Sequence, residues 1–236
     1  MFLKIIRLLF FSLLLTKNIF AIQDSSKTNF IIIFVDDMGY GDLGSYGHPT
    51  ISTPNLDMLA TEGQKWTQFY SASSVCTPSR AALLTGRLPI RNGMIGSKYR
   101  VLFQDSEYGL PSSEITIAER LKDKGYVTAA VGKWHLGRID GSHPNDQGFD
   151  DSLLLDGGLY LPENDKNVVN SKFDHPVDKM IWSRSQFSAS FNKSPSFAPG
   201  GYLTDYYTDE AIQVIEKNKH HHQYFKNLFW RFFLCK

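Results

Sequence analysis

Cysteine is scarce in this sequence of 236 residues, which contains Cys76 and Cys235 and no others. The chain can therefore form at most one internal disulfide, and at this length it can bury a sizeable core without cross-links. Charge of one sign is also lacking, because the formal net charge is +1. Bulk charge thus argues for neither nucleic acid nor an anionic membrane as a partner. Internal repeats and low-complexity tracts are absent as well, so we expect one large or two small globular domains.

A hydrophobic run long enough to span a bilayer is missing too. The longest apolar stretch near the start, residues 8–15, follows Lys4 and Arg7 and precedes the small residue Ala21. A spanning helix needs about 20 apolar residues, which makes a membrane anchor the weaker interpretation. The pattern predicts a signal peptide over residues 1–21 and entry into the secretory pathway, with secretion or the lysosome as the destination.

Entry into that pathway bears on two other features of the chain. In an oxidising compartment, Cys76 and Cys235 would ordinarily be read as a disulfide pair. Asn192 begins an Asn-Lys-Ser triplet, which is an acceptor pattern for N-glycosylation and predicts a glycoprotein.

The order of hydrophobic segments favours an α/β fold. Residues 30–35 form a continuous β-branched run that predicts a strand buried on both faces, as in a parallel sheet. Helical patterns cover 54–62, 112–124 and a segment that starts at Pro78 with Thr77 as its cap. A second strand is expected at 126–131. Strand, helices and strand in this order predict a parallel sheet flanked by helices.

The second half of the chain is less regular. Residues 138–200 are rich in Asp, Asn, Ser, Gly and Pro, and we expect a long excursion over the surface. An amphipathic helix follows at 203–217, with Leu203, Tyr207 and Ala211 on its apolar face. The remaining residues, 219–236, change to three histidines and an aromatic, basic tail, which we interpret as solvated.

Two adjacent carboxylates, Asp36 and Asp37, come directly after the first strand. Ligands of open α/β sheets bind beyond the carboxyl ends of the strands. Carboxylate oxygens suit calcium or magnesium, so the pair is a candidate metal site. Taken alone, a solvated turn ahead of Gly39 and Gly41 explains it better.

Cys76 lies at the predicted start of a helix, where free amides and the helix dipole favour an anion. Arg80, about one turn later, adds a cation suited to oxyanions. A reactive thiol and a structural cysteine explain Cys76 equally well at this point.

Lys133 and His135 follow the second strand and could stabilise an anionic group or protonate a leaving oxygen. A surface loop held by Trp134 is the plain alternative. Combined with Asp36 and Cys76, these residues describe a cation-assisted pocket for a tetrahedral oxyanion.

Four segments, in order, resemble the sulfatases and in particular the arylsulfatases. They are Val35 to Asp42 (VDDMGYGD), Thr53 to Asp57 (TPNLD), Cys76 to Arg87 (CTPSRAALLTGR) and Gly132 to Gly137 (GKWHLG). The resemblance extends over residues 30–217 and implies an alkaline-phosphatase-like mixed sheet flanked by helices. It makes 22–218 the N-terminal part of a sulfatase catalytic domain.

The resemblance also implies a mechanism. Cys76 would be converted to formylglycine by a formylglycine-generating enzyme during synthesis, which would consume the thiol and preclude a disulfide. The hydrated aldehyde would attack the sulfur of a sulfated small molecule or glycan. One calcium ion would be held by Asp36, Asp37 and the modified residue 76. Arg80 would hold the aldehyde hydrate, Lys133 would bind a sulfate oxygen and His135 would contact the hydrate.

The resemblance stops at residue 218. The family has an apolar strand and further calcium ligands after this point, and residues 219–236 do not match them. We therefore expect a sheet incomplete at its C-terminus, and a chain that is poorly folded and inactive on its own. Two other functions stay open: a phosphohydrolase of the alkaline-phosphatase-like group, and a non-catalytic secreted fragment. The sequence does not indicate the natural substrate or the oligomeric state.

Overall fold

The computed structural model describes residues 28–95, 101–102, 106–157, 188–218 and 224–230. Its centre is a five-stranded sheet with the order β1-β5-β2-β3-β4. The strands are β1 (Phe30–Val35), β2 (Val127–Gly132), β3 (Asp151–Gly157), β4 (Ser188–Phe191) and β5 (Tyr224–Trp230). All neighbours run parallel except β3 and β4, which are antiparallel. The sheet is therefore mixed, as the sulfatase resemblance implied, whereas the order of hydrophobic segments predicted only its parallel part.

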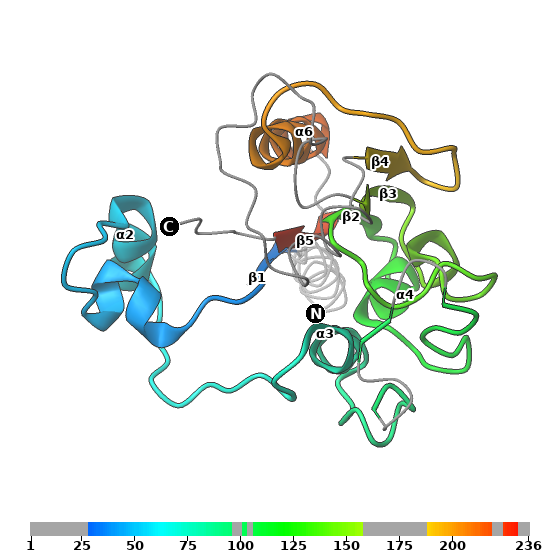
Figure 1. The fold of residues 1–236 in the computed structure, drawn as a ribbon, viewed down its shortest axis with the longest axis horizontal. Helices are drawn as coiled ribbons and strands as arrows, with labels where there is room; N and C mark the ends of the chain where they lie inside the picture. Colours follow the sequence, from blue (N-terminus) through cyan, green and yellow to red (C-terminus); the bar gives the residue numbers. More distant parts are fainter. Residues whose placement is uncertain (1–27, 96–100, 103–105, 158–187, 219–223, 231–236) are drawn as a thin grey trace, which may run out of the picture.

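Helices lie on both sides of this sheet (Figure 1). Helices α3 (Cys76–Thr85) and α4 (Ile117–Lys122) lie on one side, and α6 (Leu203–Asn218) lies on the other. The remaining described helix is α2 (Pro54–Glu62). Short 3-10 turns occur at Tyr40–Asp42, Gly44–Tyr46 and Pro144–Asp146. Figure 1 shows α2 set apart from the sheet, beyond the end of β1.

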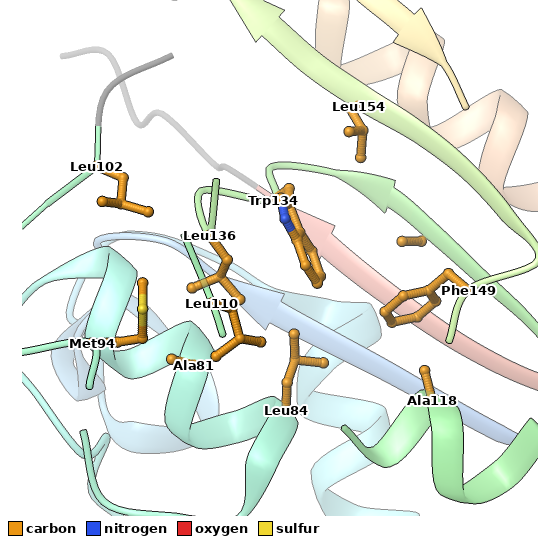
Figure 2. Packing of buried hydrophobic residues seen from close by; sticks show 11 residues of the cluster. Ala81, Leu84, Met94, Leu102, Leu110, Ala118, Trp134, Leu136, Phe149 and Leu154 are labelled. Carbon is orange, nitrogen blue, oxygen red and sulfur yellow. The ribbon is translucent and has the colours of Figure 1, made fainter. Parts of the chain in front are cut away.

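Each face of the sheet carries its own hydrophobic core, because successive side chains of a strand point to opposite faces. Ala130 and Leu154 belong to the core under α3 and α4, which also contains Trp134 and Phe149 (Figure 2). Their neighbours Val131 and Leu153 pack instead with Tyr207 and Ala211 of α6. Strand β2 is thus buried on both faces, which is the environment that a continuous apolar run predicts.

The same prediction is wrong for β1. Ile31 and Ile33 are 50% and 55% exposed, whereas Ile32 and Phe34 pack against the core that contains Trp134 and Phe149. The strand lies at the edge of the sheet formed by the described residues, and no described helix covers its outer face.

Two helix starts also differ from the prediction. Helix α3 begins at Cys76 and not at Pro78, with Val75 as its N-cap, because the hydroxyl of Thr77 bonds elsewhere. Helix α4 is shorter than the predicted 112–124: Thr116 caps it, with Glu119 completing a capping box. Residues 111–114 form a turn ahead of this cap.

Residues 138–200 are not one surface excursion. Residues 151–157 form β3, which is parallel to β2, and 188–191 form β4. Ser142, Gln147 and Phe149, in the segment between β2 and β3, are buried. The prediction was wrong because the polar residues of this segment were taken as exposed. Several of them are buried instead and bond to backbone carbonyls, as Gln147 does to Gly141.

The tail prediction is wrong where the structure describes the tail. Residues 224–230 form β5, in the middle of the sheet between β1 and β2. Tyr, Phe and Trp favour strands, but Lys226 and Asn227 interrupt the apolar run and concealed it. The predicted signal peptide over 1–21, the histidines at 220–222 and Cys235 lie outside the described residues. In the described part, no helix combines the length and the hydrophobicity that crossing a membrane requires.

Candidate active site

Three distant segments meet beyond the carboxyl ends of β1 and β2. Asp36 directly follows β1, Lys133 directly follows β2, and Cys76 is the first residue of α3. The Lys133 ammonium lies 2.7 Å from Asp36 Oδ2 and 3.3 Å from Cys76 Sγ. Parallel strands bring their carboxyl ends to one edge of the sheet, so the topology itself produces this convergence.

Two cations surround the Asp36 carboxylate, which is only 6% exposed. Lys133 contacts one oxygen, and Arg80 Nη2 lies 3.5 Å from the other. The Arg80 guanidinium is fully buried, donates through Nη1 to the Lys133 carbonyl at 2.7 Å, and lies 5.4 Å from the Phe34 ring centroid. Two cations therefore face one carboxylate in a poorly solvated place, an environment that attracts anions.

Cys76 faces the same charges from the start of α3. The amides of the first helical turn add positive potential there. The thiol is partly buried and unpaired with another cysteine among the described residues. This environment stabilises negative charge on Cys76, and therefore suits a nucleophile at this position.

His135 occupies an unusual backbone position. Its φ is +63°, in the left-handed region that side chains other than glycine seldom adopt. Nε2 lies 2.5 Å from the Leu102 carbonyl oxygen. Burial, together with the nearby charge of Lys133, lowers the pKa of His135 to about 3, against the opposing effect of the Leu102 carbonyl. The imidazole is therefore neutral at physiological pH.

Asp37 differs from its neighbour, because it is exposed and its φ is +59°. Within the described ranges, no group of three or more His, Cys, Asp or Glu side chains is placed to hold a metal ion. The structure thus brings together Asp36, Cys76, Arg80 and Lys133, sets His135 beside them and turns Asp37 toward solvent.

Thr77 and Leu102 belong to the site, and sequence analysis missed both roles. The Thr77 hydroxyl, predicted as a helix cap, donates to the His135 carbonyl at 2.9 Å and accepts from the Leu102 amide at 3.1 Å. Fifty-eight positions separate Thr77 from His135, so no local pattern could have revealed this contact.

Known proteins share both the sequence pattern and the fold. Residues 28–229 match the family model described as Sulfatase, so the match includes nearly all of β5. Human N-acetylgalactosamine-6-sulfatase is 39% identical over 206 residues, which cover 86% of this chain and 38% of that protein. Human arylsulfatase A is 59% identical over 109 residues, covering 46% of this chain and 21% of that protein.

Solved structures agree with these sequence matches. The crystal structure of Ps i-CgsB superposes with a TM-score of 0.72 at 32% identity and covers 89% of this chain and 46% of that one. The PsFucS1 sulfatase from Pseudoalteromonas sp. gives a TM-score of 0.67 at 26% identity, covering 91% and 45%. The chain therefore spans 38% of the length of the curated relative and about half of these structures.

Proposed function

Because the chain belongs to the sulfatase family and has its alkaline-phosphatase-like α/β fold, we propose that this site hydrolyses sulfate esters with a nucleophile made from Cys76. One observation carries the proposal. The Lys133 ammonium reaches both Cys76 Sγ and Asp36 Oδ2, and so unites three of the sequence segments that define the resemblance.

The sulfur of Cys76 stands in for formylglycine, which would be made by a formylglycine-generating enzyme. One hydroxyl oxygen of the hydrated aldehyde would attack sulfur, and the alcohol of the substrate would leave. The other hydroxyl would then lose its proton and re-form the aldehyde C=O as the C–O bond to the sulfate breaks, and water would hydrate the aldehyde again. The location of Cys76 supports this role. The start of α3 and the ammonium of Lys133 both stabilise negative charge on an atom attached at this position.

Lys133 and Arg80 have separate tasks in this proposal. Lys133 binds a sulfate oxygen in this proposal, which is supported by the location of its ammonium beside the nucleophile position. Arg80 is fully buried behind it and holds the Lys133 carbonyl and the Asp36 carboxylate. These two contacts fix the segment from which Lys133 projects. By the family resemblance, Arg80 also holds the aldehyde hydrate. His135, two residues after Lys133 in the same segment, contacts the hydrate.

The donor chemistry near Asp36 fits a hard divalent cation, and we propose calcium. Asp36 and Asp37 supply consecutive carboxylates, and residue 76 after modification supplies oxygen. A calcium ion there would polarise the sulfate group and the attacking oxygen. The structure supports Asp36 most directly: its buried carboxylate already balances two cations, so it belongs to the charged centre of the site.

The substrate is proposed as a sulfated small molecule or glycan. The matched proteins are named for arylsulfate, steryl sulfate and N-acetylgalactosamine 6-sulfate chemistry, and one related structure was solved with a neocarrahexaose. We further propose secretion or delivery to the lysosome, and glycosylation at Asn192. Asn192 is half-buried and directly follows β4, so its glycan would project from the rim of the sheet.

The test combines peptide mapping with turnover, and turnover also decides between this proposal and the inactive chain expected from the departure of residues 219–236. The tryptic peptide from Trp66 to Arg80 contains Cys76, and we expect mass spectrometry to find formylglycine there in protein from its natural source. An aryl sulfate and the matching aryl phosphate are then offered to wild type and Cys76→Ala. Sulfate release by wild type alone supports the proposal. Undiminished release by Cys76→Ala contradicts it, and release of phosphate alone favours a phosphohydrolase.

A further inference from the structure

A closed ring of three hydrogen bonds joins the start of α3 to the turn after β2. The Leu102 amide donates to the Thr77 hydroxyl at 3.1 Å, and that hydroxyl donates to the His135 carbonyl at 2.9 Å. The ring closes where His135 Nε2 meets the Leu102 carbonyl at 2.5 Å. Thr77 and Leu102 are fully buried, or nearly so, so water does not compete for these bonds.

This ring determines which nitrogen of His135 carries the proton. A carbonyl oxygen only accepts hydrogen bonds, so Nε2 must be the protonated nitrogen. Nδ1 of the neutral ring then carries a lone pair. That atom is buried and has no hydrogen-bond partner within the part of the chain that the structure describes. Asp36, Arg80 and Lys133 are near enough to act on this imidazole electrostatically.

The ring also maintains the backbone at His135. A left-handed φ of +63° is unfavourable for a residue with a side chain and persists only where neighbouring bonds enforce it. The Thr77 hydroxyl holds the carbonyl of this residue, and Leu102 holds its side chain. The residue that follows the nucleophile position in the sequence therefore orients a second group of the site.

We propose that Thr77 is a positioning residue whose hydroxyl fixes His135 in the Nε2–H tautomer. In this tautomer Nδ1 is unprotonated and can accept a hydrogen bond from the reacting group. The identity of that group, a hydroxyl on the modified residue 76, rests on the proposed function. The tautomer and its dependence on Thr77 do not. Thr77 itself touches neither the substrate nor the reacting atoms in this proposal.

The first measurement is nitrogen-15 NMR of histidine-labelled full chain, with the His135 resonances assigned by their loss in His135→Asn. We expect a protonated Nε2 and an unprotonated Nδ1 in wild type. Thr77→Val keeps the shape and removes the hydroxyl, and we expect averaged signals from two tautomers. Thr77→Ser keeps the hydroxyl, and we expect it to restore the single tautomer.

Thr128→Val is the matched control. Thr128 is as fully buried as Thr77, and its hydroxyl donates to the Gly148 carbonyl at 2.6 Å, but it lies at the other end of β2. We expect this variant to leave the His135 signals unchanged. A proton on Nδ1 in wild type, unchanged signals in Thr77→Val, or equal changes in Thr128→Val would each overturn the proposal. So would a His135 signal typical of an unfolded chain, since the ring would then not form.

Turnover of an aryl sulfate gives the second readout. We expect Thr77→Val to lower kcat roughly 10- to 100-fold with little change in KM, because a displaced catalytic group affects the transition state more than binding. Thr77→Ser should recover most of the loss, and equal losses in both variants would contradict a role for the hydroxyl. If wild type shows the expected tautomer and Thr77→Val loses it, while no variant hydrolyses sulfate, the proposed function fails and the positioning role stands.

Discussion

The ammonium group of Lys133 lies 2.7 Å from a carboxylate oxygen of Asp36, a residue ninety-seven positions earlier in the chain. Both groups are buried, and they connect the ends of β1 and β2, although β5 lies between these strands in the sheet. A buried pair contributes little net stability, but removal of one member leaves an uncompensated charge. The stability of the site and its chemistry therefore both depend on this one contact.

Replacing Lys133 with methionine should lower both stability and turnover. We expect the free energy of unfolding to fall by about 3 kcal/mol, the lower end for a broken buried pair, because Arg80 still faces Asp36. Urea unfolding measures this change. Turnover should fall roughly 100-fold or more through the loss of a cation at the developing charge.

Lys193→Met is the control for this change. Its partner Asp146 lies 2.6 Å away at the surface, and the Lys193 side chain is largely exposed. Such a pair contributes below about 1 kcal/mol, so the control should be nearly neutral. A double variant, Asp36→Asn with Lys133→Met, should be less destabilised than the sum of the single variants. Strict additivity would show that the two residues do not interact.

Asn192 should be important for stability apart from any glycan. Its side-chain oxygen accepts from the Ser152 amide at 2.8 Å and from Asn145 Nδ2 at 3.0 Å, and so connects β4 to the start of β3. Asn192→Ala leaves the buried Ser152 amide without this acceptor and puts alanine at a left-handed φ of +52°, so it should cost about 1–3 kcal/mol in thermal or urea unfolding. Ser194→Ala abolishes the glycosylation triplet without touching this oxygen. An equally large loss in Ser194→Ala would assign the effect to the glycan.

The sequence predicted that Asp36, Cys76 and Lys133 would lie together, because local chemistry and strand order were enough to place them. Asp36 and Lys133 each follow a strand directly, and Cys76 begins a helix, so a parallel sheet brings them together once both strands are recognised. The roles of Thr77 and Leu102 depend on contacts across 58 and 25 positions, and no periodicity in a single sequence encodes such contacts.

The errors in the fold have a related cause. The continuous apolar run of β1 suggested burial on both faces, but burial depends on what covers a strand, and no described helix covers the outer face of β1 at the edge of the described sheet. The reverse error occurred for β5, whose Lys226 and Asn227 suggested a solvated tail, whereas pairing with β1 and β2 places its backbone in the middle of the sheet. Tertiary context decided both cases.

Calcium should stabilise the folded chain through Asp37. The carboxylate is exposed, so Asp37→Asn should change the stability of the calcium-free protein by less than about 0.5 kcal/mol. Asparagine also tolerates the left-handed backbone found here. In wild type, calcium at about 100 times its dissociation constant should add about 2.7 kcal/mol, seen as a rise in Tm that a chelator reverses.

We expect Asp37→Asn to lose most of this calcium-dependent rise, whereas Glu62→Gln, at the exposed end of α2, should keep it. An equal rise in all three proteins would place the calcium elsewhere. No rise in wild type would remove calcium from the proposed function while leaving the Asp36 and Lys133 pair in place.

The neutral imidazole of His135 should make stability depend on pH in a predictable direction. Burial lowers its pKa to about 3 in the folded chain, against about 6.5 when unfolded. Between these values the unfolded chain binds one more proton, so stability falls as pH falls from about 6.5 toward 3. The slope attributable to this residue is at most about 1.4 kcal/mol per pH unit.

His135→Asn removes the titration and suits the left-handed backbone, so its free energy of unfolding should vary less between pH 7 and pH 4.5 than that of wild type. Parallel curves for the two proteins would mean that His135 is protonated, or solvated, in the folded state, and the acceptor role of Nδ1 would then be lost as well.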